Sequence, residues 1–260
     1  MVDQLPDPSA DRAGRERDLA WDGCLNVRDL GGHPTGDGRA TRFGAIVRAD
    51  SVRQLSEGGW AELVAYGVAT IVDLRGADEL ASDPAAELPV QVVHVPFFVH
   101  DDEAWAEVEA AAAAAPTAAA ATRDVYLVFL ERFRTNVASA VAAVAWAPEG
   151  TVVVHCAGGK DRTGLLTALL LRLAGVGRAT IAADYGLSEE RLRPRTEAWL
   201  AEAETDAERE RIRRVSGTPA EAMAGVLEEL ERRYGSVAAY LEAGGVTKAE
   251  LDRIRERLVA

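Results

Sequence analysis

The sequence predicts an α/β fold in which a central, mostly parallel sheet is flanked by helices and followed by a largely helical C-terminal region. Short runs rich in Val and Ile alternate with helical patterns between residues 44 and 155, and about the last seventy residues are helical. The 260-residue chain is 48% hydrophobic but only 6% aromatic. We therefore expect one large domain, over residues 21–260, with a core of small and branched side chains.

Four strands are predicted from continuous apolar runs. These runs lie at residues 44–49, 69–75, 90–96 in part, and 151–155. They lack the apolar-polar alternation of a half-exposed strand, so both faces of the sheet are expected to be buried, as is typical of parallel sheets.

The segment between the first two strands predicts a helix that completes a βαβ unit. Ser56 is a good N-cap residue, and Trp60, Leu63 and Val64 share one helical face before Gly67 ends the pattern.

Two longer helical patterns precede the last strand. Residues 101–122 are acidic and then rich in Ala, with an interruption at Pro116. The Ala-rich part, at 110–122, is either a solvated helix or part of a lid over the pocket. Residues 124–147 predict a single long amphipathic helix, with apolar positions at Val125, Val128, Phe129, Phe133 and Val137. In the C-terminal region, breaks are expected at residues 217–219, 235 and 244–245.

The net charge of −13 argues against several classes of partner. Such a chain repels nucleic acids and anionic membrane surfaces, so we expect no nucleic-acid partner. A phosphorylated substrate is also anionic, and its site must therefore be a local positive pocket in an acidic surface.

The N-terminus and the cysteines predict a cytoplasmic location, although export without a signal peptide stays open. Residues 1–20 are charged, lack the layout of a signal peptide, and are expected to be a mobile lead-in. Two cysteines are too few for a disulfide framework. The longest apolar stretch starts near Gly164, contains Arg172, and is too short to insert stably in a membrane.

One segment carries the chemistry, at the end of the last predicted strand. The strand ends at His155, a loop runs from Cys156 to Arg162, and an apolar helix is expected to begin near Thr163. We call residues 156–162 the site loop. Its N–H groups and those of the helix start converge on one point, which suits the oxygens of a phosphate, and Arg162 adds a planar, two-pronged hydrogen bond.

The loop composition predicts an activated thiol at Cys156. A free cysteine thiol has a pKa of about 8.5 and is mostly protonated at neutral pH, so the loop amides, the Thr163 hydroxyl and the Arg162 charge are expected to stabilise the thiolate. The bare Cys-x5-Arg spacing is a weak signal, but with Gly159, Thr163 and Gly164 in place it is strong. The thiolate can then attack phosphorus to form a phosphocysteine intermediate, and no metal or cofactor is needed.

The segment HCAGGKDRTG at 155–164 resembles the signature loop of atypical bacterial tyrosine phosphatases, which belong to the protein-tyrosine-phosphatase superfamily. Five further blocks agree with that family, and the resemblance runs from about Cys24 to the C-terminal end. The blocks are NVRDLGG at 26–32, RADS at 48–51, VDLR at 72–75, DYGLSEE at 184–190 and YGSVAAYLEAGGV near the C-terminus. The resemblance implies a phosphotyrosine-phosphatase-like fold, often with a helical lid. It also implies activity on protein phosphotyrosine, with phosphoserine, phosphothreonine and phosphoinositides as further substrate classes.

Residue by residue, the resemblance makes Cys156 the nucleophile, Arg162 the phosphate clamp and Asp161 the proton donor to the leaving oxygen. Asp101 or Asp102 is the alternative donor, since many superfamily members take this acid from a separate mobile loop, but Asp161 is favoured because its position is fixed. The expected phosphate-binding residues are Ala157, Gly158, Gly159, Lys160, Thr163 and Gly164.

Other interpretations stay open beside this one. A module that binds phosphoproteins without turnover would use the same cradle, whereas Arg162 and the absence of a second loop thiol argue against sulfur transfer and arsenate reduction. His155 is expected to be structural. We also expect ion pairs within residues 28–29 and between Asp73 and Arg75, with contact to the substrate as the alternative role for either pair. A protective disulfide between Cys24 and Cys156 is considered as well.

Overall fold

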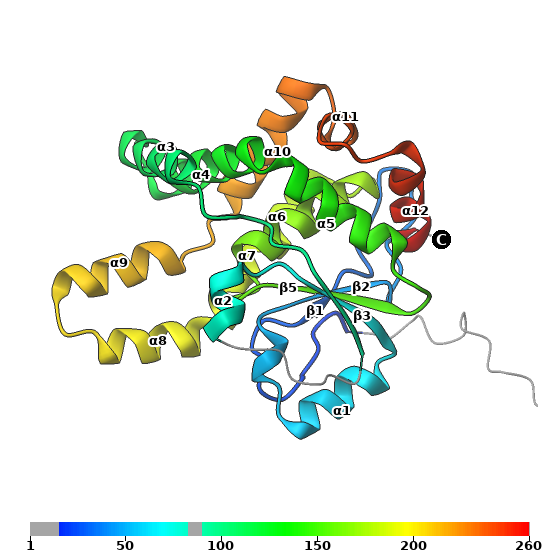
Figure 1. Cartoon of the computed structure of the whole chain (residues 1–260), viewed down its shortest axis with the longest axis horizontal. Helices are drawn as coiled ribbons and strands as arrows, with labels where there is room; N and C mark the ends of the chain where they lie inside the picture. The colour runs from blue at the N-terminus through cyan, green and yellow to red at the C-terminus, as the bar shows by residue number, and fades with distance from the viewer. Residues whose placement is uncertain (1–15, 83–89, 260) are drawn as a thin grey trace, which may run out of the picture.

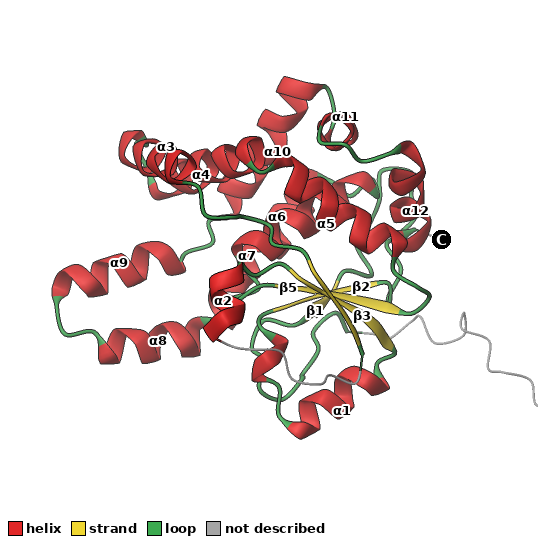
Figure 2. Ribbon diagram, viewed as in Figure 1, coloured by secondary structure: helices red, strands yellow, loops and turns green. Residues whose placement is uncertain are grey.

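The computed structural model describes residues 16–82 and 90–259, and within them a five-stranded sheet forms the centre of the molecule (Figures 1 and 2). The spatial order of its strands is β1-β2-β5-β3-β4, with β1 antiparallel to β2 and every other neighbouring pair parallel. The strands are β1 (Arg28–Asp29), β2 (Ile46–Ala49), β3 (Val68–Asp73), β4 (Gln91–His94) and β5 (Thr151–His155). The predicted fold class is confirmed, and β5 lies in the middle of the sheet.

The four predicted strands are all present, and each lies within or close to its apolar run. The short strand β1 is the addition, because two residues are too few for a periodic pattern. Successive side chains of the strands point to opposite faces. Ile46, Val72 and Val154 pack into the larger hydrophobic cluster, while Val47 and Ile71 pack into the smaller one. The sheet is therefore covered on both faces along β2, β3 and β5, as the continuous apolar runs predict. The edge strand β4 differs, because most of its residues are exposed.

The two clusters place helices on both sides of the sheet (Figure 1). Helix α1 and the 3-10 turn η1 cover one face, and α5 and α6 pack on the other. The helical elements are η1 (Val52–Gln54), α1 (Glu57–Ala65), α2 (Ala77–Ser82), α3 (Asp102–Ala114), α4 (Ala118–Arg132), α5 (Arg134–Trp146), α6 (Asp161–Leu173), α7 (Arg178–Arg191), α8 (Arg193–Glu202), α9 (Asp206–Ser216), α10 (Ala220–Tyr234), α11 (Val237–Ala243) and α12 (Lys248–Leu258).

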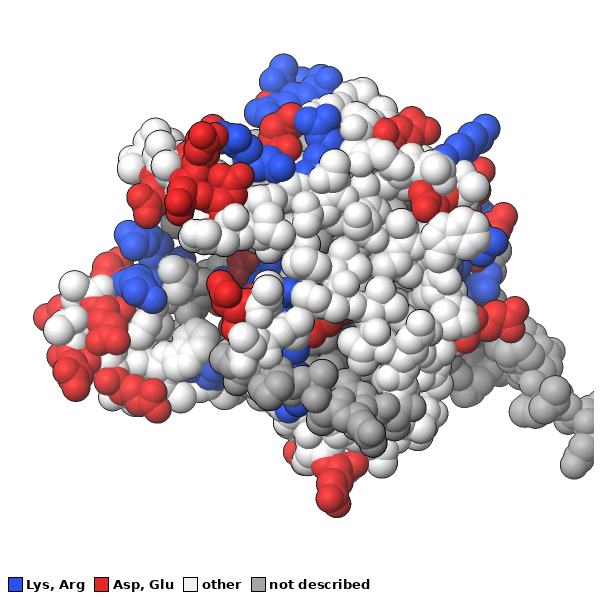
Figure 3. Space-filling view, viewed as in Figure 1, with Lys and Arg blue, Asp and Glu red and all other residues white. Residues whose placement is uncertain are grey.

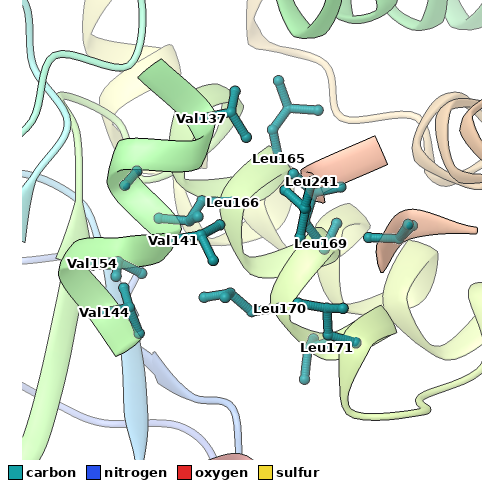
Figure 4. Packing of buried hydrophobic residues seen from close by; sticks show 14 of the residues in the cluster. Val137, Val141, Val144, Val154, Leu165, Leu166, Leu169, Leu170, Leu171 and Leu241 are labelled. Carbon is teal, nitrogen blue, oxygen red and sulfur yellow. The ribbon is translucent and has the colours of Figure 1, made fainter. Parts of the chain in front are cut away.

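Helix α6 is the central helix of the larger cluster. Its residues from Thr163 to Leu171 are all buried, since α5, α7, α10, α11 and α12 surround it. Figure 4 shows Leu165, Leu166 and Leu169 of α6 beside Val137 and Val141 of α5. Such enclosure fixes the start of α6, and with it the end of the site loop.

Two helix predictions need correction. The single helix expected over residues 124–147 is broken at Phe133, which ends α4 and precedes α5 with φ −109° and ψ 29°. No Gly or Pro marks this break; Phe133 packs in an aromatic cluster with Phe98 and Phe129. In α1, Ser56 caps the helix as predicted and Leu63 is buried, but Val64 is 47% exposed.

Ordered structure begins earlier in the chain than predicted. Residues 1–15 of the predicted lead-in lie outside the described residues. The backbone N–H of Leu19 donates to the Val27 carbonyl at 3.3 Å, so ordered structure begins before Trp21.

Helices α8 and α9 form a hairpin that projects from the body (Figure 1) and has acidic residues at its outer end (Figure 3). No helix among residues 16–82 and 90–259 has both the length and the apolar character needed to cross a bilayer.

Candidate active site

The site loop lies between the C-terminal end of β5 and the start of α6, where parallel strands characteristically form binding crevices. Cys156 is 2% exposed and lines a cavity of about 770 Å³, together with Arg162 and residues of α8 and α9. Helix α6 begins at Asp161 rather than near Thr163, so the last two residues of the site loop form the first helical turn.

The carbonyl oxygens of the site loop are held away from its centre. Neighbouring elements donate to them as follows: the Ser51 N–H to Ala157 O at 3.1 Å, Asn26 Nδ2 to Gly158 O at 3.0 Å and to Gly159 O at 3.1 Å, and Arg48 to Gly159 O at 2.9 Å. The backbone N–H groups of residues 157–160 have no acceptor among the described residues. This arrangement leaves the donors for an anion.

The two adjacent glycines of the loop have different roles. Gly159 has φ +62°, and a Cβ there would lie 2.4 Å from the Ala49 carbonyl oxygen, so only glycine fits. Gly158 is not in the left-handed region; a Cβ there would instead meet Arg195 Nη2 at 2.8 Å. Gly159 therefore supplies a torsion that favours glycine, whereas Gly158 leaves room for the Arg195 side chain.

A buried charge cluster supports the loop from beneath. The Asp184 carboxylate of α7 accepts from Arg48 at 2.7 Å and from Arg28 at 3.3 Å, and it also pairs with Arg17. Burial raises the pKa of Asp184, but the three guanidinium groups lower it more, and the net shift is well below the usual range. Arg48 thus joins Asp184 to the Gly159 carbonyl, which fixes the loop in one orientation.

The predicted ion pair within residues 28–29 is wrong. Neighbours in a strand point to opposite faces. Arg28 turns toward Asp184, while Asp29 accepts from the backbone N–H groups of Gly31 and Gly44 at 2.6 and 2.7 Å. The pair between Asp73 and Arg75 is confirmed, at 2.8 Å.

Arg162 is paired with a carboxylate that the sequence analysis missed. Glu79 of α2 accepts from both terminal nitrogens of the guanidinium, one of them at 2.8 Å. Burial lowers the pKa of Arg162, yet the hydrogen bonds to Glu79 and the charge of Cys156 outweigh it, and the net shift of the pKa is upward. Arg162 is therefore a fixed cation near Cys156, and Glu79, which lines the same cavity, holds its guanidinium.

Replacing Glu79 by Gln is expected to lower kcat/KM by about tenfold to a hundredfold, because the guanidinium then loses the carboxylate that orients its plane. Initial rates with p-nitrophenyl phosphate measure the effect. Asp78→Asn, at the adjacent position of α2, is the matched control. A lower KM in Glu79→Gln would contradict the prediction, since Glu79 would then compete with phosphate for Arg162.

Asp161 lines the same cavity as Cys156, and its carboxylate accepts a hydrogen bond from the hydroxyl of Tyr126 on α4. Tyr126 and Tyr185 are buried and share a hydroxyl contact at 2.9 Å. Burial, and next the Asp161 charge, raise the pKa of Tyr126, so this phenol stays a hydrogen-bond donor. Two buried tyrosines thus hold the carboxylate, a support that the sequence analysis did not predict.

The alternative acids lie elsewhere. Asp101 caps α3 by accepting from the Ala104 N–H at 3.1 Å, and Asp102 is 94% exposed beside His100. Neither residue lines the cavity that contains Cys156.

Lys160 is buried, and its ammonium donates to the carbonyl oxygen of Val215 at the end of α9. The same nitrogen lies 3.6 Å from Asp161 Oδ1. Lys160 therefore joins the site loop to the α8–α9 hairpin, in addition to lying at the cavity where it was predicted.

Two of the predicted phosphate contacts differ from expectation. Because α6 begins earlier than predicted, the Gly164 N–H already donates to the Lys160 carbonyl at 2.9 Å. A Cβ at Gly164 would also lie 3.0 Å from Tyr185 Cδ2, so this glycine permits close helix packing. The Thr163 hydroxyl is buried without a hydrogen-bond partner among the described residues, and the expected bond to the Cys156 sulfur is not formed.

His155 and Cys24 are both structural in their contacts. His155 is buried, with Nε2 3.6 Å from Asp73 and Nδ1 3.2 Å from the Cys156 carbonyl, and burial lowers its pKa. Cys24 and Cys156 are free thiols. Burial, with the charge of Asp50, raises the pKa of Cys24, which disfavours the thiolate that disulfide exchange requires.

A second cavity, of about 680 Å³, adjoins the first, with Lys160, Asp161 and Arg162 lining both. Its other walls are mainly apolar and come from the segment after β4, from α3 and from α4, and residues of α2 and of the end of α9 complete the lining. Part of the Ala-rich segment is among them, at Ala112, Ala118 and Ala121. This segment is thus a wall of a cavity that Asp161 and Arg162 also line, rather than a fully solvated helix.

Residues 19–260 match the sequence model of the tyrosine phosphatase family. The chain belongs to this family. It is 28% identical to triple specificity protein phosphatase PtpB of Mycobacterium tuberculosis, over 94% of this chain and 98% of that protein. It is 27% identical to a tyrosine-protein phosphatase of Nostoc commune, over 82% of this chain and 74% of that protein. The predicted resemblance to this family is thereby confirmed over nearly the whole chain.

Proposed function

We propose that the chain is a cysteine-dependent phosphatase that hydrolyses phosphate monoesters, chiefly protein phosphotyrosine, through a phosphocysteine intermediate. The observation that carries the proposal is the orientation of the site loop around Cys156: its carbonyls are bonded outward, and its N–H groups have no acceptor among the described residues. Arg162, held by Glu79, supplies the charge that neutralises a bound phosphate.

The first chemical step is an in-line displacement at phosphorus. The Cys156 thiolate forms the S–P bond while the bond from phosphorus to the ester oxygen breaks, and that oxygen takes the proton of Asp161. In the second step a water molecule attacks phosphorus through its oxygen, and Asp161 accepts the proton that the water loses. The S–P bond then breaks, inorganic phosphate leaves, and the thiolate is restored.

Phosphotyrosine is the favoured substrate class because the cavity around Cys156, of about 770 Å³, is large enough for a ring-bearing ester. Phosphoserine, phosphothreonine and phosphoinositides are proposed as further substrates, since the mycobacterial relative is named for triple specificity. A module that binds phosphoproteins without turnover is the competing proposal.

Turnover of p-nitrophenyl phosphate in the presence of a chelator, followed by acid quench and mass spectrometry, tests the function. We expect steady release of nitrophenol and a phosphate attached to the peptide that contains Cys156. Binding of phosphotyrosine peptide without release of phosphate would establish the non-catalytic alternative instead.

Replacing Asp161 by Asn is expected to lower kcat for a phosphotyrosine peptide by about 10²- to 10⁴-fold. The loss should be smaller for p-nitrophenyl phosphate, whose leaving group needs less help from an acid. Initial rates measured with both substrates check this.

The matched control is Asp102→Asn, a change at an exposed carboxylate outside the cavity that contains Cys156. It should keep the rates of the parent with both substrates. If the large loss appears in Asp101→Asn or Asp102→Asn, and not in Asp161→Asn, the proton donor is the acid at the start of α3.

A further inference from the structure

Helix α8 presents one face to the cavity that contains Cys156. Leu192, at the N-cap position of α8, lines this cavity together with Arg195, Thr196 and Trp199. Their spacing of three, one and three residues is that of a single helical face. One continuous face of α8 therefore forms part of the cavity wall.

Arg195 brings a cation to the rim of the site loop. Its Nη2 lies so close to Gly158 that a Cβ there would be 2.8 Å away, and its guanidinium stacks over the Trp199 ring at 5.2 Å from the centroid. The stacking holds the plane of the guanidinium, which leaves fewer orientations to lose when a ligand binds.

This guanidinium has no acceptor among the described residues. Its Nε is buried without a hydrogen-bond partner, in a chain with 42 acidic and only 29 basic residues. Other cations of the cavity are engaged: Arg162 with Glu79, Arg75 with Asp73, and Lys160 with the Val215 carbonyl. A buried donor without a partner at a substrate cavity calls for an acceptor from outside the chain.

We propose that Arg195 binds a second anionic group of the substrate, namely an acidic side chain next to the phosphotyrosine of a phosphorylated peptide. The proposal rests on the proposed function. The scissile phosphate is already matched by the loop N–H groups and Arg162, whereas Arg195 comes from α8 and lies beside Gly158 at the wall of the same cavity.

A peptide fits this surface better than a phosphoinositide headgroup does. Trp199 is 45% exposed beside Arg195, so the cation adjoins an apolar surface. A peptide offers acidic and apolar side chains next to each other, while an inositol headgroup offers only hydroxyl and phosphate groups.

The test compares two phosphotyrosine peptides that differ only in Glu or Gln beside the phosphotyrosine. Their dissociation constants are measured calorimetrically with the Cys156→Ser variant, so the comparison needs no turnover. We expect the Glu peptide to bind about tenfold more tightly, and Arg195→Gln in the same background to abolish this preference. Arg195→Lys should restore part of it, since charge returns without the planar fork.

The matched control is Arg193→Gln, which removes a cation from the same helix at an exposed position paired with Glu197, at 3.9 Å. It should keep the preference for the Glu peptide. Equal weakening of both peptides in Arg195→Gln would overturn the proposal, because Arg195 would then act on the scissile phosphate or the loop. The proposal would also be overturned if Arg195→Gln weakened the binding of an inositol bisphosphate and left the binding of both peptides unchanged. Arg195 would then recognise a lipid headgroup. If the parent binds with the expected preference but turns nothing over, the inference stands and the proposed function fails.

Discussion

Replacing Cys156 by Ser is expected to lower the turnover of phosphotyrosine peptides and p-nitrophenyl phosphate by about a thousandfold or more. A serine hydroxyl stays protonated in a site that stabilises an anion by hydrogen bonds, and it is a poor nucleophile without an adjacent base. The residues proposed to bind the phosphate are unchanged, so the variant should still bind substrate. Initial rates and calorimetric titration with a phosphotyrosine peptide measure the two effects separately.

Cys24→Ser is the matched control, since it changes the other thiol of the chain by the same single atom. Cys24 donates to the Ser51 carbonyl at 3.5 Å, a contact that a hydroxyl can replace. This variant should keep parental turnover. Its single remaining thiol also allows the alkylation rate of Cys156 to be followed across pH. Turnover in Cys156→Ser equal to that of the parent would remove the nucleophile assignment.

The strands and the site loop could be predicted from the sequence because their signals are local. The run TVVVH at β5 is buried on both faces, and the glycine demanded by the Ala49 carbonyl lies within the motif at Gly159. Cys156, Asp161 and Arg162 come together for the same reason, since a short loop and one helical turn separate them. Features of this kind are determined by residues that are adjacent in the sequence, so a single sequence is enough to predict them.

The supports of the site could not be predicted from one sequence. Arg28 and Asp184 are 156 positions apart, and Arg162 and Glu79 are 83 apart, so no periodicity connects them. Several blocks of the family resemblance contain these residues, but without indicating which side chains meet. The break at Phe133 was missed for a related reason: aromatic packing in the folded chain ends α4, and no local breaker does.

Replacing Asp184 by Asn is expected to lower the free energy of unfolding by about 3–5 kcal/mol at neutral pH. The carboxylate is 2% exposed and is the shared partner of Arg28 and Arg48, which are themselves fully buried, and of the partly exposed Arg17. An amide keeps the shape but leaves these cations without their counter-charge. Urea unfolding followed by fluorescence measures the loss. Asp252→Asn, which breaks an exposed pair with Arg255 at 2.8 Å, is the control and should cost less than about 1 kcal/mol.

The pH dependence of the Asp184 effect follows from the sign of its pKa shift. The three arginines hold the pKa of Asp184 in the folded chain below that of an ordinary carboxyl. The stabilisation is therefore complete above the unfolded pKa of about 4 and is lost as pH falls toward the folded value. The gap in unfolding free energy between parent and Asp184→Asn should be the same at about pH 7 and about pH 5, and it should narrow below about pH 4. A gap that widens on acidification would show that the carboxylate does not balance these cations. Phosphatase activity should fall in the variant as well, because Arg48 links Asp184 to the Gly159 carbonyl, and a loosened loop no longer aims its N–H groups at one point.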